Sequence, residues 1–324
     1  MRIVIHGVGA IGGVLLGALT RAGVPALGIA RGARLAALTD RGLLLRTPAG
    51  ADRIGVDCVA APAEVAWRPD DVILLTTKTQ DTEAALADLR AAGVTEQALF
   101  CVQNGIENER LALRSFPNVH AVNVMMPAEY MADDEAVAFG DPNLGVYDLG
   151  RYPSGTDAAD AALAAALTSA GVAGFATADT MVAKRGKLLL NLGNVVEAAL
   201  GRDAAAPDVY EALRDEGRAV FRTAGLDWRE ASDDARRDLM KITPVDGAPR
   251  FGSSTTQSLA KRSGRVETDW LNGEIVLIAR LAGTEAPLNA AAARMGAALA
   301  AGRAGAGTMT PDAVRHALGL PGAG

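Results

Sequence analysis

The chain opens with the stretch MRIVIHGVGAIGG, residues 1–13, and its first half can be understood from this stretch outward. The first apolar run predicts a short buried strand, and the apolar run after the glycines predicts a helix that ends at Gly23. Gly7, Gly9 and Gly12 lie between them in the spacing G-x-G-x-x-G. A strand, this glycine turn and a helix in direct succession are typical of a dinucleotide-binding site.

Each glycine of this turn has a physical task in phosphate binding. Gly7 allows the tight turn, Gly9 lets the backbone approach a pyrophosphate, and Gly12 lets the helix pack closely on the strand. Unpaired N–H groups at the N-terminus of the helix then favour the negative charge of the phosphates. The alternative is a plain strand-turn-helix connection without a ligand. We expect the cofactor-binding turn to consist of Gly7, Val8, Gly9, Ala10, Ile11 and Gly12.

The overall composition narrows the class of protein. A length of 324 residues suggests about two domains, and 49% apolar residues are sufficient for two cores. The net charge of −6, without a long basic run, argues against nucleic acid or an anionic membrane as a partner. Cys58 and Cys101 lack the spacing of metal ligands, so we expect free thiols and no metal site. Without an apolar leader or a membrane-spanning run of ~20 apolar residues, a cytoplasmic protein is expected.

The pattern along the chain changes near residue 178. Before it, apolar strand-like runs alternate with helical runs; after it, the helical period of 3.6 residues dominates. The predicted strands are 26–30, 54–59, 71–76, 98–102 and 119–124, with a short β segment within 137–149. The predicted helices are 34–39, 79–92, 181–200, 206–224, 233–242, 266–281 and 287–301. We therefore predict an α/β fold: an N-terminal Rossmann-type doubly wound sheet over residues 1–178 and a C-terminal all-helical domain over residues 179–324. This architecture is typical of small-molecule dehydrogenases.

The end of the second predicted strand indicates which nicotinamide nucleotide binds. An acidic side chain there would accept a hydrogen bond from the ribose 2′-hydroxyl of NAD, but this strand ends at Arg31 and contains no carboxylate. A guanidinium matches the 2′-phosphate of NADP, so Arg31, with Arg34 as a second candidate, favours NADPH. The alternative is that both are solvated surface arginines, because only five of the 32 basic residues are lysines.

Lysine is the candidate proton donor. A carbonyl that accepts hydride develops an alkoxide, which a nearby acid must protonate. Lys187, Asn191 and Asn194 lie at i, i+4 and i+7 of the helix that opens the second domain, so they share one face. Burying such groups without partners costs about 1–3 kcal/mol each, so either the face is solvated or a polar ligand satisfies it. Lys184, three residues earlier, is the fallback for the acid.

Further polar residues follow the predicted strands and helices. The hydroxyls of residues 253–258 could bind a carboxylate, and Glu267 could bind a lysine or a substrate hydroxyl. The alternative is a hydrophilic turn before a helix, where acidic residues are favoured anyway. Lys78 and Asn104 follow predicted strands at the edge where such sheets bind ligands, although an Asn-Gly pair is also typical of a turn.

These motifs, taken together, resemble the ketopantoate reductase family over nearly the whole chain and in the same order. The matching stretches are GVGAIGG from Gly7, Arg31, TTK ending at Lys78, QNG from Gln103, KLLLN from Lys187, Ser253-Ser254 and ETDWLNG from Glu267. The resemblance implies a Rossmann domain with a helical domain. It also implies NADPH-dependent reduction of 2-dehydropantoate to pantoate, in pantothenate biosynthesis. A homodimer is compatible with it.

The resemblance also implies the roles of individual residues. Lys187 corresponds to the catalytic acid, and Glu267 supports the substrate hydroxyl and the lysine ammonium. Asn104 and Asn191 orient the substrate and the lysine. Ser254 contacts the substrate carboxylate, and Lys78 lies near the cofactor. Asn194 is added to the substrate-binding candidates from its place on the lysine face.

The chain departs from the family pattern at two places in the expected substrate pocket. The family often has an asparagine eight residues after the lysine, where this chain has Val195, with Asn194 one place early. The stretch from Gln257 to Glu267 is one residue longer than in the family. These departures leave open a hydroxyacid or opine-type dehydrogenase with another substrate, and a non-catalytic NADP-binding sensor.

Overall fold

The computed structural model describes residues 1–201, 204–261 and 264–322, and this part of the chain divides into two compact units. Unit 1 consists of Met1–Asn104, Asn108–Ala183 and Ser232–Arg250. Unit 2 consists of Gly105–Glu107, Lys184–Ala231 and the described residues of Phe251–Gly324. A single boundary near residue 178 predicts that the chain passes from the first domain to the second only once. In the structure, the chain returns to unit 1 for residues 232–250.

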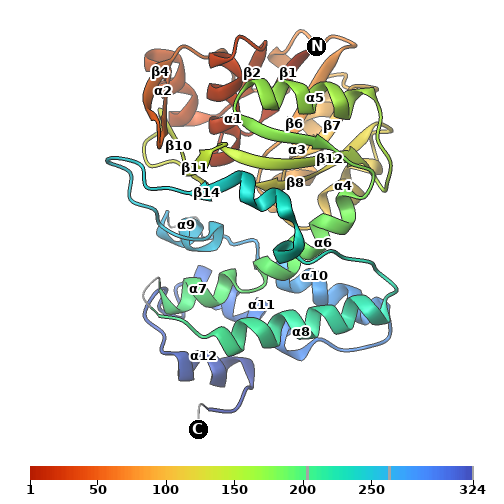
Figure 1. The fold of residues 1–324 in the computed structure, drawn as a ribbon, viewed down its shortest axis with the longest axis vertical. Helices are drawn as coiled ribbons and strands as arrows, with labels where there is room; N and C mark the ends of the chain where they lie inside the picture. Colours follow the sequence, from red (N-terminus) through yellow and green to blue (C-terminus); the bar gives the residue numbers. More distant parts are fainter. Residues whose placement is uncertain (202–203, 262–263, 323–324) are drawn as a thin grey trace. The chain divides into compact units, whose positions relative to one another are not determined.

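Unit 1 is built on an eight-stranded sheet (Figure 1). In order, its strands are β13 (Val172–Ala176), β12 (Gly145–Arg151), β8 (Val119–Met125), β7 (Ala98–Cys101), β6 (Asp71–Leu75), β1 (Arg2–His6), β2 (Ala26–Ile29) and β5 (Cys58–Val59). Neighbouring strands are parallel, except that β12 and β8 are antiparallel. The chain runs from β1 outward through β2 to one edge and from β6 outward through β7 toward the other. This confirms the predicted doubly wound sheet and puts its switch point between β1 and β6.

Helices cover both faces of this sheet because its inner strands are apolar on both sides. Ile3 and Ile5 of β1 belong to the core that includes residues of α1 (Ala10–Arg21) and α5 (Ala158–Ser169). Ile73 and Leu75 of β6 belong instead to a core that includes residues of α3 (Thr82–Ala91). Alternate residues of a strand point to opposite faces, so each inner strand contributes to two cores. Further helices of this unit include η1 (Pro62–Glu64), η2 (Thr79–Asp81), α2 (Gly32–Arg41) and α4 (Asn108–Leu113).

Unit 1 also contains two small sheets, and the sequence predicted only some of their strands. One has the order β4-β3-β10-β9, formed by β4 (Gly50–Ile54), β3 (Leu43–Thr47), β10 (Glu135–Ala138) and β9 (Ala128–Glu129). The single strand predicted over 54–59 is wrong in this respect, because β4 ends at Ile54 and β5 begins at Cys58. The other small sheet pairs β11 (Gly140–Pro142) antiparallel with β14 (Met240–Ile242), which lies beside it in Figure 1.

The helix predicted over 233–242 is also wrong. This segment forms η3 (Ala231–Asp233), η4 (Ala235–Leu239) and then β14. Leu239 and Ile242 have helical spacing, but they are 39% and 53% exposed, so they form no buried face that would favour a helix. Backbone pairing with β11 and an ion pair from Arg236 to Asp148 of β12 hold the segment in unit 1.

Unit 2 is mostly helical, as predicted. Its helices are α7 (Asn194–Leu200), α8 (Pro207–Thr223), α9 (Ser254–Ala260), α10 (Thr268–Leu281), α11 (Pro287–Ala300), α12 (Pro311–Leu318) and α6 (Thr180–Asn191) from Lys184 onward. The continuous helix predicted over 181–200 is broken before α7. Gly193 lies at this break, and a Cβ there would collide with the ring of Tyr210. None of the described helices combines the length and apolarity that crossing a membrane requires.

Candidate functional site

The glycine turn after β1 has the geometry expected of a phosphate-binding loop. Gly7 has φ +110°, and a Cβ there would lie 2.9 Å from the backbone nitrogen of Thr77. At Gly12 a Cβ would collide with the carbonyl oxygen of Gly7 and lie 2.8 Å from Thr76 Oγ1. Both glycines are therefore required by the fold of the turn itself.

Gly9 differs from these two glycines. A Cβ at Gly9 would meet no protein atom within 4 Å, so packing among the described residues does not require a glycine here. Gly9 is also the N-cap of α1, and no side chain caps this helix end. Open space in front of uncapped N–H groups fits the pyrophosphate of a dinucleotide.

Arg31 and Arg34 have different environments at the end of β2. The Arg31 side chain is 66% exposed and pairs with Asp88 of α3, with 2.7 Å between Nη2 and Oδ2. An exposed pair of this kind contributes about 0–1 kcal/mol, so Arg31 can exchange it for a phosphate. Arg31 remains the candidate for the 2′-phosphate of the nucleotide.

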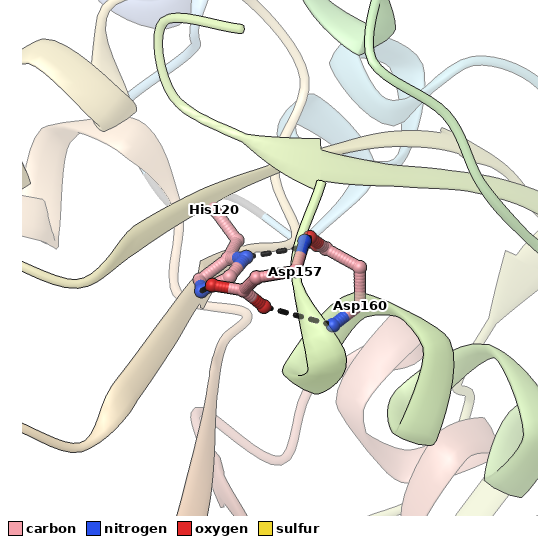
Figure 2. Close-up of side chains that lie close together, drawn as sticks. All are labelled: His120, Asp157 and Asp160. Carbon is pink, nitrogen blue, oxygen red and sulfur yellow. Dashed lines mark hydrogen bonds and ion pairs between the residues drawn. The ribbon is translucent and has the colours of Figure 1, made fainter. Parts of the chain in front are cut away.

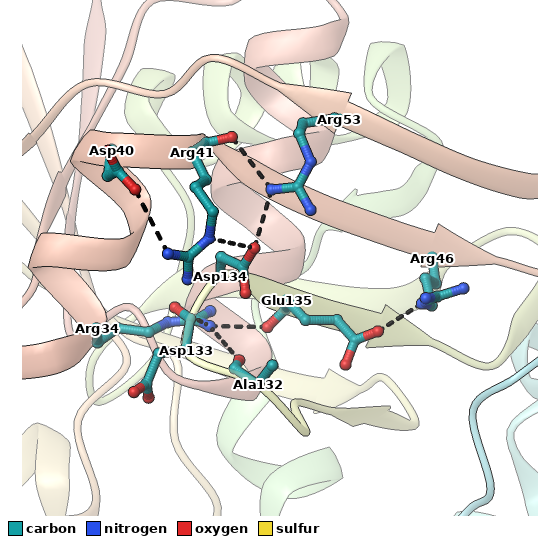
Figure 3. A network of polar contacts seen from close by, with 9 residues as sticks. All are labelled: Arg34, Asp40, Arg41, Arg46, Arg53, Ala132, Asp133, Asp134 and Glu135. Atoms are coloured by element: carbon teal, nitrogen blue, oxygen red, sulfur yellow. Dashed lines mark hydrogen bonds and ion pairs between the residues drawn. The ribbon is translucent and has the colours of Figure 1, made fainter.

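Arg34 is instead held by backbone carbonyls (Figure 3). Its Nε donates to the carbonyl oxygen of Val8 at 2.9 Å, inside the glycine turn. Its Nη1 donates to the carbonyl oxygens of Ala132, Asp133 and Glu135 at 3.1, 2.9 and 2.8 Å. These carbonyls use Nε and Nη1, but the buried Nη2 has no hydrogen-bond partner among the described residues, so Arg34 stays a candidate as a second phosphate ligand. It links the glycine turn to the start of β10.

His6, the last residue of β1, lies next to the turn and is 3% exposed. Burial, with a smaller contribution from the positive charge of Arg31, lowers the pKa of His6 to about 4. The imidazole is therefore neutral at physiological pH, consistent with a packing role.

Lys78 and Asn104 follow two neighbouring parallel strands, β6 and β7, and so lie at the same edge of the sheet. A buried network ties the two loops together. Gln103 Nε2 donates to Thr82 Oγ1 at 2.8 Å and to the carbonyl oxygen of Thr77 at 3.0 Å. Asn108 Nδ2 donates to the carbonyl oxygen of Asn104 at 3.2 Å, which holds the backbone at Asn104 in place.

The polar face of α6 is partly buried. Lys187 is half-buried, and Lys184 is 3% exposed. Asn191, one turn after Lys187, is 8% exposed, and its Nδ2 has no hydrogen-bond acceptor among the described residues. A buried amide donor without a partner costs about 1–3 kcal/mol, so it marks a place where a ligand can supply the acceptor.

Asn194 and Ser254 are each the first residue of a helix, α7 and α9, and the structure links these two helix ends. Ser253 Oγ donates to the carbonyl oxygen of Asn194 at 3.4 Å. Glu267 is the N-cap of α10 and is 7% exposed. Asn272 of the same helix donates through Nδ2 to the carbonyl oxygen of Leu192 at 3.0 Å, at the break between α6 and α7.

The predicted site residues thus divide between the two units. The glycine turn, Arg31, Lys78 and Asn104 belong to unit 1, whereas Lys187, Asn191, Asn194, Ser254 and Glu267 belong to unit 2. The sequence analysis assigned no role to Glu197, which bonds to the turn before α9, or to Thr268, whose buried hydroxyl has no partner among the described residues. Glu197 belongs to no motif, whereas Thr268 lies within the ETDWLNG stretch, where its place directly after Glu267 was the available signal.

One further cluster looks like a metal site but has a structural role. His120, Asp157 and Asp160 offer ligand atoms within 4.8 Å of one another (Figure 2). Asp157 and Asp160 form a capping box at the start of α5, and Asp160 Oδ1 lies 2.8 Å from Nδ1 of His120. The spacing of the two aspartates is itself a capping-box pattern. These groups are already used to hold the end of α5 on β8.

Comparison with known proteins places both parts of the chain in one family. Residues 3–144 match the family described as "Ketopantoate reductase PanE/ApbA", and residues 189–300 match "Ketopantoate reductase PanE/ApbA C terminal". A 2-dehydropantoate 2-reductase from Pyrococcus horikoshii is 26% identical over 302 residues, covering 89% of this chain and 94% of the relative.

Solved structures show the same similarity. A PanE/ApbA family ketopantoate reductase from Ralstonia eutropha superposes with a TM-score of 0.76 at 26% identity, covering 93% of this chain and 98% of that one. A D-mandelate dehydrogenase solved with NADH and anilino(oxo)acetate superposes with a TM-score of 0.77 at 21% identity, with the same coverage. The second likeness, at this identity, shows the fold alone.

Proposed function

Because the chain belongs to the ketopantoate reductase PanE/ApbA family, we propose that it reduces a small 2-keto acid to the 2-hydroxy acid with NADPH. The first candidate substrate is 2-dehydropantoate, which would place the enzyme in pantothenate biosynthesis. The observation that carries the proposal is the buried, unpartnered amide of Asn191 on the helix face of Lys187. An anionic, oxygen-rich substrate would supply the missing acceptor for this amide. In a purely structural helix, the buried amide donor would remain unpaired at a cost in stability.

The residues of unit 1 fit a dinucleotide. The open space at Gly9 and the uncapped N-terminus of α1 would receive the pyrophosphate, and Arg31 would bind the 2′-phosphate. Lys78 and Asn104, at the carboxyl ends of β6 and β7, would contact the nucleotide, Asn104 also reaching the substrate. The reduced nicotinamide supplies the hydride.

The residues of unit 2 would act on the substrate. As negative charge develops on the carbonyl oxygen of the substrate, the ammonium of Lys187 donates a proton to this oxygen and becomes a neutral amine. Asn191 donates a hydrogen bond to the substrate, and Glu267 accepts from the substrate hydroxyl and from the lysine. Asn194 and Ser254 bind the carboxylate end through their amide and hydroxyl groups.

A second candidate is a 2-hydroxyacid dehydrogenase with a bulkier or more apolar substrate. The departure at Val195 motivates it, because this position is apolar and lies in the core of unit 2, where the family often has an asparagine. Without the asparagine amide, the site lacks a polar group that would otherwise select against a substrate with an apolar side chain.

A substrate panel separates these candidates. NADPH oxidation is followed with 2-dehydropantoate, a branched aliphatic 2-keto acid, an aromatic 2-keto acid and a keto acid supplied with an amino acid. We expect kcat/KM to be highest for 2-dehydropantoate. A preference for the aromatic acid would support the second candidate, and a protein that binds NADPH but turns over none of the four would be a sensor rather than a reductase.

A further inference from the structure

The turn that leads into α9 is held by a carboxylate from α7. Glu197 Oε1 accepts a hydrogen bond from the backbone nitrogen of Ser253 at 2.7 Å and one from Thr256 Oγ1 at 3.2 Å. Ser253 is the N-cap of α9, and its Oγ accepts from the backbone nitrogen of Thr256. One carboxylate oxygen therefore binds both the backbone and a side chain of the first turn of α9.

The residue before this N-cap is built to admit the carboxylate. Gly252 has φ +113°, a conformation that residues with a Cβ rarely adopt. A Cβ at this position would also collide with Glu197 Oε1. On the other side, Gln257 Nε2 donates to the carbonyl oxygen of Gly252 at 3.1 Å, so the turn is fixed from both directions.

The same cluster contacts the candidate substrate residues. Ser253 Oγ donates to the carbonyl oxygen of Asn194, the first residue of α7, three residues before Glu197. Ser254 is the first residue of α9 and directly follows the Ser253 nitrogen that Glu197 binds. The two helix ends that present Asn194 and Ser254 are thus held together through one carboxylate and one hydroxyl.

We propose that Glu197 is a positioning residue that sets the placement of Asn194 and Ser254 and thereby the affinity for the substrate carboxylate. The inference rests on the proposed function, in which these two residues bind that carboxylate. Glu197 acts through hydrogen bonds to the turn and takes no part in the transfer of hydride or proton. A displacement of about 1 Å in such contacts is sufficient to cost up to about 100-fold in efficiency.

Two substitutions of Glu197 test the proposal in the full-length protein. Glu197→Ala removes both hydrogen bonds, and we expect KM for the best 2-keto acid to rise by about 10- to 100-fold, with KM for NADPH changed less than about twofold. Glu197→Gln keeps an oxygen that accepts from Ser253, so its KM for the keto acid should stay within about threefold of the wild type. The rescue by glutamine separates positioning from a need for negative charge.

Glu216 provides a matched control in the same unit. It is also half-buried and caps a helix across a tertiary contact. Its carboxylate accepts from the backbone nitrogens of Leu288 and Asn289 at 2.9 and 2.8 Å, and from the Asn289 side chain at 2.8 Å, at the start of α11. Glu216→Ala removes three hydrogen bonds and should lower the melting temperature at least as much as Glu197→Ala, while KM for the keto acid stays within about twofold of the wild type.

The outcomes distinguish this inference from the proposed function. An unchanged KM in Glu197→Ala, or an equal rise in Glu216→Ala, would overturn the positioning role and leave the reductase proposal standing. Absence of turnover in the wild type would overturn the reductase proposal and with it the role in substrate affinity. Amide hydrogen exchange over residues 252–257 then still reports on the cluster: faster exchange in Glu197→Ala supports its hold on the turn, and unchanged exchange contradicts it.

Discussion

Replacing Gly9 by alanine separates nucleotide binding from folding. The new methyl group would meet no protein atom within 4 Å, but Gly9 has φ −88° and ψ −144°, outside the backbone regions that alanine prefers. The loss of a glycine N-cap costs about 0.5 kcal/mol, and a similar stabilisation offsets it because alanine lowers the conformational entropy of the unfolded chain. Because the backbone strain remains, we expect the free energy of unfolding of the free protein to fall by no more than about 1 kcal/mol. The methyl group does, however, occupy the space assigned to the pyrophosphate.

The expected effect on binding is large enough to measure by thermal unfolding. At a NADPH concentration of about 100 Kd, binding stabilises the wild type by about 2.7 kcal/mol, which corresponds to a rise in Tm of roughly 5–10 °C. If Gly9→Ala raises Kd about 100-fold, the same concentration stabilises the variant by only about 0.4 kcal/mol, or roughly 1 °C.

Gly12→Ala is the matched control for this experiment. Its methyl group would collide with the carbonyl oxygen of Gly7 and press on Thr76 Oγ1 at 2.8 Å, so the free protein should itself lose about 1–3 kcal/mol. The reasoning is refuted if Gly9→Ala shows the full NADPH-dependent rise in Tm. It is equally refuted if Gly9→Ala destabilises the free protein as much as Gly12→Ala does.

Three further predictions concern catalysis, cofactor choice and pH. Lys187→Ala should lower kcat by about 100-fold or more, as expected for loss of a general acid, and near-normal turnover measured by NADPH oxidation would reject this role. Arg31→Ala should raise KM for NADPH by about tenfold and leave KM for NADH unchanged. Asp88→Asn releases Arg31 from its ion pair and should not raise KM for NADPH. Equal use of both nucleotides by all variants would contradict the assignment of Arg31 to the 2′-phosphate. His6 has a pKa of about 4 in the folded protein, below its unfolded value of 6.5, so the unfolded state binds the proton more tightly and stability falls as pH drops from about 6.5 toward 4. The total loss is on the order of 3 kcal/mol, and His6→Gln should flatten urea-unfolding profiles over this window.

Local sequence patterns were sufficient to predict those elements whose interacting residues lie close together in the sequence. The strand β1, the turn from Gly7 and the helix α1 were predictable, because the apolar period and the glycines act within one continuous segment. The same holds for the amphipathic helices α8, α10 and α11 of unit 2. The polar spacing from Lys187 to Asn194 was also visible, although the break before α7 was not, since it depends on the ring of Tyr210 from another helix.

The remaining features depend on partners far along the chain, which no local period reveals. β14 is a strand because β11, about one hundred residues earlier, offers its backbone, and the helical spacing of Leu239 and Ile242 has no buried face to match it. Arg34 was a second candidate for a phosphate ligand because arginine chemistry suits that task, and only the folded chain shows that the carbonyls of residues 132 and 133 already bind its Nη1. Amino-acid order thus specified the fold class, the glycine turn and the candidate residues, because these follow from periodicity and short-range sterics. Tertiary packing decided which polar groups are already paired and which, like the amide of Asn191, stay available for a ligand, because a hydrogen bond depends on distance in space and not on separation in sequence.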